Sequence, residues 1–222
     1  MLTVHHLNNS RSQRVLWLLE ELGLEYEIER YKRDAETMRA PDSLKKVHPL
    51  GKSPVVTDGE LTLAESGAIV EYLVNCYGNG RLVPIEDSAA KLRYTYWLHY
   101  AEGSAMPPLL FKLVMGQVEE KASFWQRPLA SAVTSQVKDS FIDPEISLHL
   151  GYMESELVSH AWFAGETFTA ADIQMSFPIE VAAASADFSR QYPVLAVFLA
   201  RIHERPAYQQ SLKRGGEYEV LG

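Results

Sequence analysis

The sequence is poor in cysteine, with Cys76 as the one cysteine among 222 residues. A single cysteine excludes an internal disulfide and indicates a reducing compartment, for which we expect the cytoplasm. Because no Cys-x-x-Cys pair is present, dithiol redox chemistry is excluded. The seven histidines form no His-Glu-x-x-His motif and no cluster with cysteine, so we expect no metal site.

Basic residues are in deficit, and long apolar runs are missing. The formal net charge is −8 and the pI is near 5.4, which argues against nucleic-acid binding because that function requires a basic surface. A local positive patch for a small anion remains compatible with this charge. No apolar run reaches about 18 residues, and the N-terminus has no basic start followed by an apolar stretch. We therefore expect neither a membrane span nor a signal peptide.

The first 78 residues predict an α/β domain. Strand-like alternation covers 2–7 and 26–31, and short strands are expected at 55–57 and 61–64 around an Asp58-Gly59 turn. Apolar residues at helical spacing fall between Ser10 and Gly23, and further helices are expected at about 41–47 and 66–76. The order is β-α-β-α-β-β-α. Since a βαβ unit is parallel and a tight hairpin is antiparallel, it predicts a mixed four-stranded sheet.

The rest of the chain predicts an all-helical domain. Residues 79–87 are rich in glycine and proline and are typical of a linker, which leaves 88–222 as the second domain. Thr169 to Asp172 fit a capping box at the start of a helix. Prolines are expected to begin, bend or end helices in this region, namely Pro107, Pro108, Pro128, Pro144, Pro193 and Pro206.

The stretch HPLGKSPVVTDGELTLAESGAIVEYL, residues 48–73, places Ser-Pro before one strand and Glu-Ser before a helix. In this setting it resembles the cytosolic glutathione transferase family, whose pattern here is Asn-Pro-x-Gly-x-x-Pro followed by Glu-Ser-x-Ala-Ile. His48 stands where asparagine is common. SRSQR after the first strand and APDSLKKVHPLGKSP are similar to bacterial and fungal members with an active-site serine. The resemblance covers nearly the whole chain and implies a thioredoxin-like fold for residues 1–78.

The resemblance also implies a cis peptide bond between Ser53 and Pro54, which costs little before proline. Such a bond turns the backbone N–H and C=O of Ser53 away from the sheet ladder. These groups can pair with the backbone of a peptide's cysteine, as an added strand would. The implied ligand is glutathione, acting as a co-substrate, with no tightly bound cofactor.

Further residues near these joints are implied to hold glutathione. Ser66 is expected to cap the helix that it begins, and the positive end of that helix suits a carboxylate. The resemblance adds that the γ-glutamyl carboxylate binds Ser66 while Glu65 faces the ammonium group. Lys52 is implied to help hold the tripeptide. Arg39 is implied to meet its glycine carboxylate, with Arg33 as the alternative.

The implied chemistry needs a thiolate, because the thiol is a poor nucleophile. A thiol with a pKa of about 8.5 is only about 3% ionised at a pH of about 7, and lowering that pKa by about 2 units requires roughly 2.7 kcal/mol. A hydroxyl that donates to the sulfur contributes about 1.5–3 kcal/mol, and a helix N-terminus about 0.3–1 kcal/mol. Together these suffice without a metal or a protein cysteine.

Ser10 is the predicted hydroxyl, because it lies where the first strand meets the first helix and Ser10-x-x-x-Arg14 resembles the serine-type pattern. Ser12 and Asn9 are alternatives, since the alignment is ambiguous by a residue or two. A plain helix cap is the structural alternative for Ser10. Arg14 is expected to support the site. No tyrosine or cysteine stands at this strand end, which argues against the tyrosine-type and cysteine-type classes.

The predicted function is that of a detoxifying glutathione S-transferase, which attacks small hydrophobic electrophiles, and peroxides as well, with the glutathione thiolate. Tyr100 and Ser104 are implied to line the electrophile pocket, although helical spacing alone indicates a core position. The resemblance implies a homodimer, with no membrane or nucleic-acid partner. Two other functions stay open: glutathione-dependent reduction of disulfides or peroxides, and a non-enzymatic ligand-binding or scaffold role.

Overall fold

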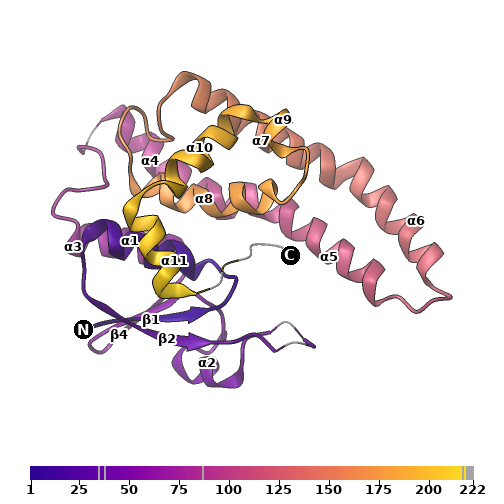
Figure 1. Cartoon of the computed structure of the whole chain (residues 1–222), viewed down its shortest axis with the longest axis horizontal. Coiled ribbons are helices and arrows are strands. Elements are labelled where there is room, and N and C mark those ends of the chain that lie inside the picture. Colours follow the sequence, from indigo (N-terminus) through magenta and orange to yellow (C-terminus); the bar gives the residue numbers. More distant parts are fainter. Residues whose placement is uncertain (35, 38, 87, 217, 219–222) are drawn as a thin grey trace.

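The computed structural model describes residues 1–34, 36–37, 39–86, 88–216 and 218. Asp87 of the predicted linker, and residues 217 and 219–222 of the predicted second domain, lie outside the described residues. An α/β part is followed by a helical part (Figure 1). The first part comprises β1 (Leu2–Leu7), α1 (Ser12–Leu22), β2 (Tyr26–Tyr31), α2 (Asp42–Val47), β3 (Val55–Asp58), β4 (Leu61–Ala64) and α3 (Ser66–Tyr77). The predicted order of elements is confirmed.

The four strands form one mixed sheet in the order β2-β1-β3-β4. The β1 and β2 strands are parallel, because α1 carries the chain back across the sheet between them. The β3 strand is antiparallel to both β1 and β4. Ser10, just after β1, therefore lies at the same edge of the sheet as Ser53, just before β3. This topology brings together two joints that are far apart in the sequence.

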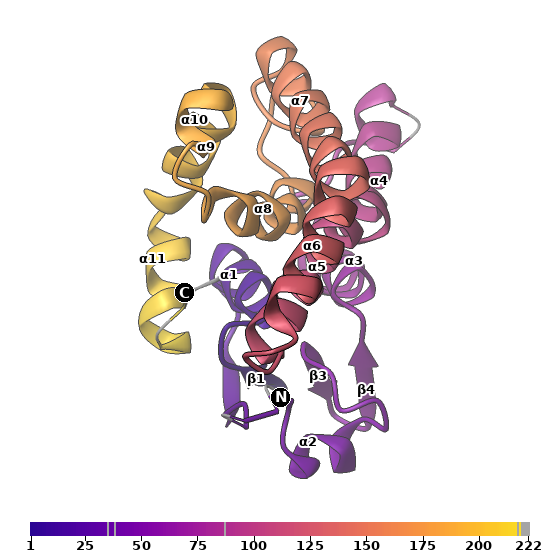
Figure 2. The same ribbon diagram turned by 90° about the vertical axis from the view of Figure 1, so that its right-hand side faces the viewer.

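Helix α1 lies between the sheet and the helical part. Figure 2 shows it under α8, with α11 on one side and α3 on the other, and it packs against each of them. Leu16, Trp17 and Leu18 are all fully buried, so α1 is enclosed on every side and not only along one apolar stripe. Gly23 ends the helix with a φ of 65°, the left-handed conformation that glycine adopts without strain.

The helical part confirms the predicted all-α domain, and beyond an isolated bridge between Trp162 and Gly165 its described residues hold no strand. Helices α5 and α6 form a hairpin that projects from the body of the molecule (Figure 1). The elements are α4 (Ala89–Tyr100), the π-helical η1 (Ala101–Ala105), α5 (Met106–Lys121), α6 (Arg127–Val137), the π-helical η2 (Lys138–Ile142), α7 (Asp143–Ser159), α8 (Ala170–Ala183), α9 (Phe188–Gln191), α10 (Pro193–His203) and α11 (Pro206–Gly215).

Prolines mark helix boundaries as predicted. Pro107 and Pro108 lie in the first turn of α5, directly after η1. Proline lacks an N–H and its ring crowds the preceding turn, and a π-helical turn accommodates both effects. The first turns of α6, α10 and α11 also contain proline.

The predicted capping box begins α8. The Thr169 hydroxyl accepts from the backbone N–H of Ala171 at 3.3 Å, and the Asp172 carboxylate accepts from the backbone N–H of Thr169 at 2.8 Å. Asp172 also accepts from the backbone N–H of Phe163, which ties the preceding loop to the helix. Helix α8 is buried over nearly its whole length, so this cap lies inside the core.

Two details of the prediction are wrong. The hairpin turn is shifted by one residue, because Asp58 pairs with Leu61 within the sheet and Gly59, with a φ of 60°, takes the first turn position. The short helix α9 was not predicted, since four residues are too few for a recognisable period. Across the described residues, no helix combines the length and apolar character that a membrane crossing demands.

Candidate active site

The joint before β3 presents free backbone groups. The Ser53–Pro54 peptide bond is cis, as the resemblance predicts. The Ser53 hydroxyl donates to the carbonyl of His5 at 3.0 Å and accepts from the backbone N–H of Leu7 at 3.3 Å, so the side chain is fastened to β1. Its backbone N–H and C=O have no partner within the described part of the chain. An extended peptide can use both groups.

Ser10 lies beside this joint, in the turn between β1 and α1. Its Oγ is 3.4 Å from Ser53 Oγ, although the two residues are 43 positions apart. It also accepts from the backbone N–H of Ser12 at 3.2 Å, but it is not the N-cap residue that the structural alternative expected. Helix α1 itself begins at Ser12, with Arg11 at the N-cap position. The hydroxyl is therefore fixed at a helix N-terminus and next to the joint before β3.

The two alternatives to Ser10 differ from it in position. Ser12 is fully buried, and its hydroxyl lies 2.8 Å from His6 Nδ1 and 2.7 Å from Ser10 Oγ. It therefore faces the interior behind Ser10. Asn9 is exposed, with a left-handed φ of 50°. Of the three, Ser10 is the one whose hydroxyl contacts Ser53.

Arg14 connects the first helix to the start of α3. The guanidinium is buried, and its Nη2 donates to Ser66 Oγ at 3.0 Å and to Glu102 Oε1 at 2.5 Å. Its Nη1 donates to the carbonyl of Gln174 at 2.6 Å. The Gln174 side chain donates to the same Ser66 hydroxyl at 3.3 Å. Two donors from different elements thus hold this serine.

The expectation that Ser66 caps its helix is wrong. Glu65 occupies the N-cap position, and no side chain caps this end of α3. The Ser66 hydroxyl instead accepts from Arg14 and Gln174, because the packing of α1 and α8 places stronger donors beside it. Glu65 itself has a φ of 70°, an uncommon conformation for a residue other than glycine.

Positive charge gathers at this end of α1 despite the acidic composition. Arg11 donates to both oxygens of Glu102 at 2.9 Å, and Arg14 donates to the same carboxylate. Burial lowers the pKa of Arg14 and Glu102 opposes that decrease, so the guanidinium stays charged. Both guanidinium groups also lie over the Phe177 ring, at 5.0 and 5.1 Å. Two cations face one carboxylate, and the excess positive charge favours an anion.

Comparison with known proteins identifies the family. Models of the glutathione S-transferase N-terminal and C-terminal domains match residues 1–75 and 142–206. Glutathione S-transferase 3 of Schizosaccharomyces pombe is 39% identical over 209 residues, which cover 93% of this chain and 85% of that protein. The chain belongs to the glutathione S-transferase family.

Solved structures agree with this assignment. The crystal structure of a glutathione S-transferase from Actinobacillus pleuropneumoniae matches with a TM-score of 0.79 and 31% identity, over 99% of this chain and 95% of that one. The glutathione transferase URE2P6 from Phanerochaete chrysosporium, in complex with oxidized glutathione, matches with a TM-score of 0.75 over 96% of each chain. Its identity is 24%, so this likeness shows the fold alone. The predicted family and its two-part fold, thioredoxin-like and then helical, are confirmed.

The other charged residues predicted to hold glutathione lie at the surface. Lys52 and Glu65 are exposed and flank the strand pair β3–β4, while Pro54 is buried. Arg39 is exposed in the loop before α2. Arg33, its alternative, donates to the carbonyls of Asn8 and Asn9 at 3.2 and 3.3 Å, and so fastens the turn that carries Ser10. These roles remain predictions for the glutathione S-transferase fold of this chain.

The two residues predicted for the electrophile pocket are divided between α4 and η1. Tyr100 is buried, and its hydroxyl lies 2.5 Å from His149 Nδ1 on α7. Burial raises the pKa of this hydroxyl. Glu102, two residues later, faces α1, so Tyr100 points to the other side of its helix. Ser104 is half-buried in η1.

Sequence reasoning missed the residues from the helical part that reach the site. Glu102, Gln174 and Phe177 carry no motif, and each acquires its place only when α4, η1 and α8 pack on α1. The buried arginine was the available signal, because a buried guanidinium needs an anionic partner. No sequence pattern indicates which of the glutamates supplies it.

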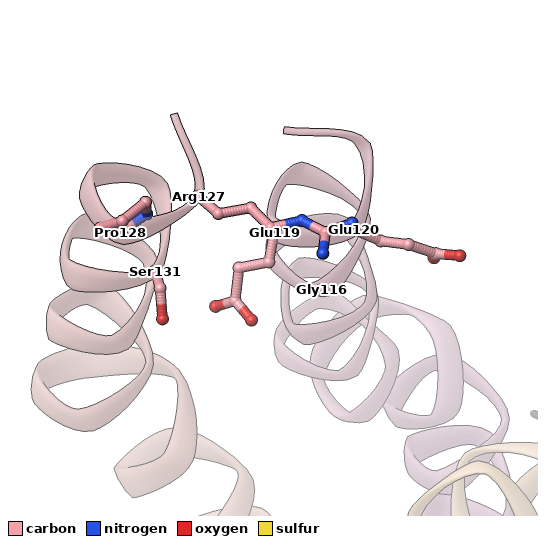
Figure 3. A pocket seen from close by; sticks show the side chains of 6 residues that line it. All are labelled: Gly116, Glu119, Glu120, Arg127, Pro128 and Ser131. Atoms are coloured by element: carbon pink, nitrogen blue, oxygen red, sulfur yellow. The ribbon is translucent and has the colours of Figure 1, made fainter. Parts of the chain in front are cut away.

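Two shallow hollows lie away from these residues. One, of about 600 Å³, lies between α5 and α6, where Arg127 reaches across toward α5 (Figure 3). The other, of about 430 Å³, is lined by residues of α1 and α11. Neither is lined by a residue predicted to bind glutathione or an electrophile. The interpretation of the active site therefore rests on the hydrogen-bonded groups around Ser10 and Ser53.

Proposed function

We propose that this protein binds glutathione and conjugates its sulfur to small hydrophobic electrophiles. The proposal assigns glutathione binding to residues 1–78, a linker role to 79–87, and the electrophile pocket to 88–222 with Tyr100 and Ser104. Ser10 donates a hydrogen bond to the thiolate and so lowers the pKa of the thiol. The attacked carbon forms a bond to sulfur as its leaving group departs.

The position of Ser10 carries the proposal. A hydroxyl at a helix N-terminus lies 3.4 Å from the serine whose free backbone groups can pair with a peptide. A tripeptide aligned on Ser53 through its cysteine would bring its sulfur toward this hydroxyl. The relative from Phanerochaete chrysosporium in complex with oxidized glutathione supports the same ligand for this fold.

The rest of the tripeptide fits the charges around it. We assign the γ-glutamyl carboxylate to Ser66, which Arg14 backs with a buried positive charge. Its ammonium group is assigned to Glu65, and the remaining contacts to Lys52 and Arg39. These four side chains come from three segments, so the site would select a molecule that carries all of these charges at once.

Replacing Ser10 with alanine tests the proposal. Loss of a hydrogen bond to a charged sulfur removes about 1.5–3 kcal/mol, so turnover of an aryl halide at neutral pH should fall about 10- to 150-fold. Glutathione affinity, measured by calorimetry, should change little, because Ser53 and Ser66 remain. Ser43→Ala, on the exposed surface of α2, is the matched control. Normal turnover by the Ser10 variant would show that another group activates the thiol.

A thiolate held in this way also attacks peroxides and mixed disulfides. Assaying the parent protein on an aryl halide, a peroxide and a small mixed disulfide ranks these activities. Retention on immobilised glutathione without turnover of any of them would favour the non-enzymatic binding role.

We also propose that the protein is a homodimer. Helices α5 and α6 expose more large apolar side chains than an isolated monomer usually presents, and a second copy would cover them. The exposed set on these two helices is Leu110, Phe111, Leu113, Val114, Val118, Leu129, Val133 and Val137.

A further inference from the structure

His6 is a buried imidazole that the proposed reaction does not yet use. It lies on β1, is 4% exposed, and shares a strand face with Leu2 and Val4, the face that α1 covers. Its Nδ1 is 2.8 Å from the hydroxyl of Ser12 at the start of α1. A histidine enclosed in this way needs partners for both ring nitrogens, and those partners fix which nitrogen carries the proton.

The partners form one continuous line that leads to Ser10. From His6 Nδ1 the line runs 2.8 Å to Ser12 Oγ and then 2.7 Å to Ser10 Oγ. Both distances are within the range of strong hydrogen bonds that involve hydroxyl groups. The 3.4 Å from Ser10 Oγ to Ser53 Oγ is longer than that range, so the Ser10 proton is directed toward Ser12 in preference to Ser53.

The second ring nitrogen sets the direction of this line. Nδ1 lies against Ser12, and the backbone of Gly215, at the end of α11, raises the pKa of the ring as a hydrogen-bond partner, so we assign the ring proton to Nε2 and the lone pair to Nδ1. Ser12 must then donate to His6, and Ser10 must donate to Ser12. Every O–H along the line points inward, which leaves the Ser10 oxygen able to accept a proton from the cleft.

We propose that Ser12 and His6 form a proton relay behind Ser10, through which the proton of the glutathione thiol leaves the sulfur. The inference rests on the proposed role of Ser10. The S–H bond breaks as its proton binds Ser10 Oγ, the Ser10 proton passes to Ser12 Oγ, and the Ser12 proton passes to His6 Nδ1. The products are a thiolate that accepts from Ser10 and an imidazolium that donates to Ser12 and Gly215. No other reactant is consumed, and the proton returns to water when the product leaves.

The surroundings keep the His6 ring neutral and disfavour the imidazolium until a thiolate forms at Ser10. Burial lowers the pKa of His6 to about 4, Arg30 lowers it further, and the hydrogen bond to Gly215 opposes these effects. The imidazole is therefore neutral at physiological pH. Arg30 on β2 is the charged group that acts on it, while Ser12, Gln13 and Gly215, which face it from α1 and α11, are uncharged. A thiolate at Ser10 adds an attractive charge and raises the proton affinity of the ring at the moment of transfer.

Two substitutions test whether His6 accepts a proton through Ser12 or only supports Ser12 by a hydrogen bond. Ser12→Ala interrupts the line, and His6→Asn keeps a hydrogen-bond acceptor near the Nδ1 position but removes the base. His5→Asn is the matched control, because His5 lies on the same strand and its side chain contacts Tyr31 and Thr57 on the opposite face of the sheet. Glutathione affinity and melting temperature confirm that each variant is folded and binds.

The readout is the ultraviolet absorbance of the bound thiolate as a function of pH. Both relay variants should raise the apparent pKa of bound glutathione by about one unit, a tenfold lower thiolate fraction at a given acidic pH, and should approach parent turnover at alkaline pH. Nitrogen NMR of labelled histidine should show Nδ1 of His6 gaining a proton when glutathione binds to the parent, but not to Ser12→Ala. Parent-like titration of both variants overturns the relay, as does a parent-like His6→Asn alone, which would reduce His6 to a support.

Ser10→Ala distinguishes a failure of the relay alone from a failure of the proposed role of Ser10. If Ser10→Ala shifts the thiol titration and the relay variants do not, Ser10 keeps its proposed role and the relay is wrong. If Ser10→Ala titrates as the parent does, the proposed role of Ser10 and the relay fail together. Should His6→Asn not fold, Ser12→Ala and the NMR signature decide the matter without it.

Discussion

Glu102 offers the sharpest test of how the helical part supports the site. Its carboxylate accepts from both Arg11 and Arg14, which lie one turn apart on α1. The substitution Glu102→Gln retains the shape and one acceptor oxygen but removes the negative charge. Arg14 is then left 1% exposed with no anionic partner, and the two guanidinium groups repel each other without compensation.

The burial of the ion pair between Arg14 and Glu102 determines how much stability Glu102→Gln should lose. Removing one partner of a fully buried pair costs about 3–5 kcal/mol, because the remaining charge stays desolvated. The Glu102 side chain is 30% exposed, so water screens part of the interaction, and its oxygen still accepts a hydrogen bond. We therefore expect a loss of about 1.5–3 kcal/mol in the free energy of unfolding. Because Arg14 also positions Ser66, KM for glutathione should rise more than kcat falls.

The pH dependence gives an independent check. Burial opposes ionisation of Glu102, but Arg14 and Arg11 outweigh it and hold the pKa of the carboxyl below its ordinary value of 4.5. A carboxyl with a depressed pKa binds protons more weakly in the folded chain. Its contribution is fully present above about 4.5 and is lost as pH falls through the folded pKa. Urea unfolding should show this acid loss in the parent and a smaller one in Glu102→Gln.

Asp42→Asn is the control, because its ion pair with Lys45 on α2 is exposed and should contribute nothing measurable. If Glu102→Gln were as stable as the parent and bound glutathione equally well, the buried charge would not depend on this carboxylate. The account of Arg14 as a support for Ser66 would then be refuted.

Two further predictions concern the core and the assembly. Asp172→Ala leaves the N–H groups of Phe163 and Thr169 without an acceptor, and should cost about 2–4 kcal/mol by chemical unfolding. Burial raises the pKa of Asp172 to about 6 despite these hydrogen bonds, so the parent should lose part of its stability as pH rises from 3.8 toward about 6, and the variant should lack that slope. Val133→Lys on α6 should convert the proposed dimer to a monomer in light scattering, whereas Ala200→Lys, at an exposed position on α10, should not.

The sequence predicts most of the elements because their signals are local. Gly23 and Thr169–Asp172 mark helix ends by their own chemistry, and the βαβ unit together with the tight hairpin predicts the mixed sheet. Ser10 and Ser53 were predicted at two separate joints, one after the first strand and one before the third, and the sheet topology brings them to within 3.4 Å of each other. Ser66 was wrongly expected to be a cap, because its partners Arg14 and Gln174 come from helices that no local pattern places beside it.

The burial of α1 explains both the successes and the failures of the prediction. An apolar stripe at helical spacing predicts one buried face, yet Gln13 and Arg14 on the remaining surface are as buried as Leu16. Gln13 donates to Ser211 of α11, and Arg14 reaches α3, η1 and α8. Polar side chains on an enclosed helix are tolerated only where each finds a partner, so these bonds are conditions of the fold as well as features of the site. Helix α1, which follows Ser10, is thus held from three directions by the helical part. The proposed glutathione site therefore depends on both parts of the chain and not on the α/β part alone.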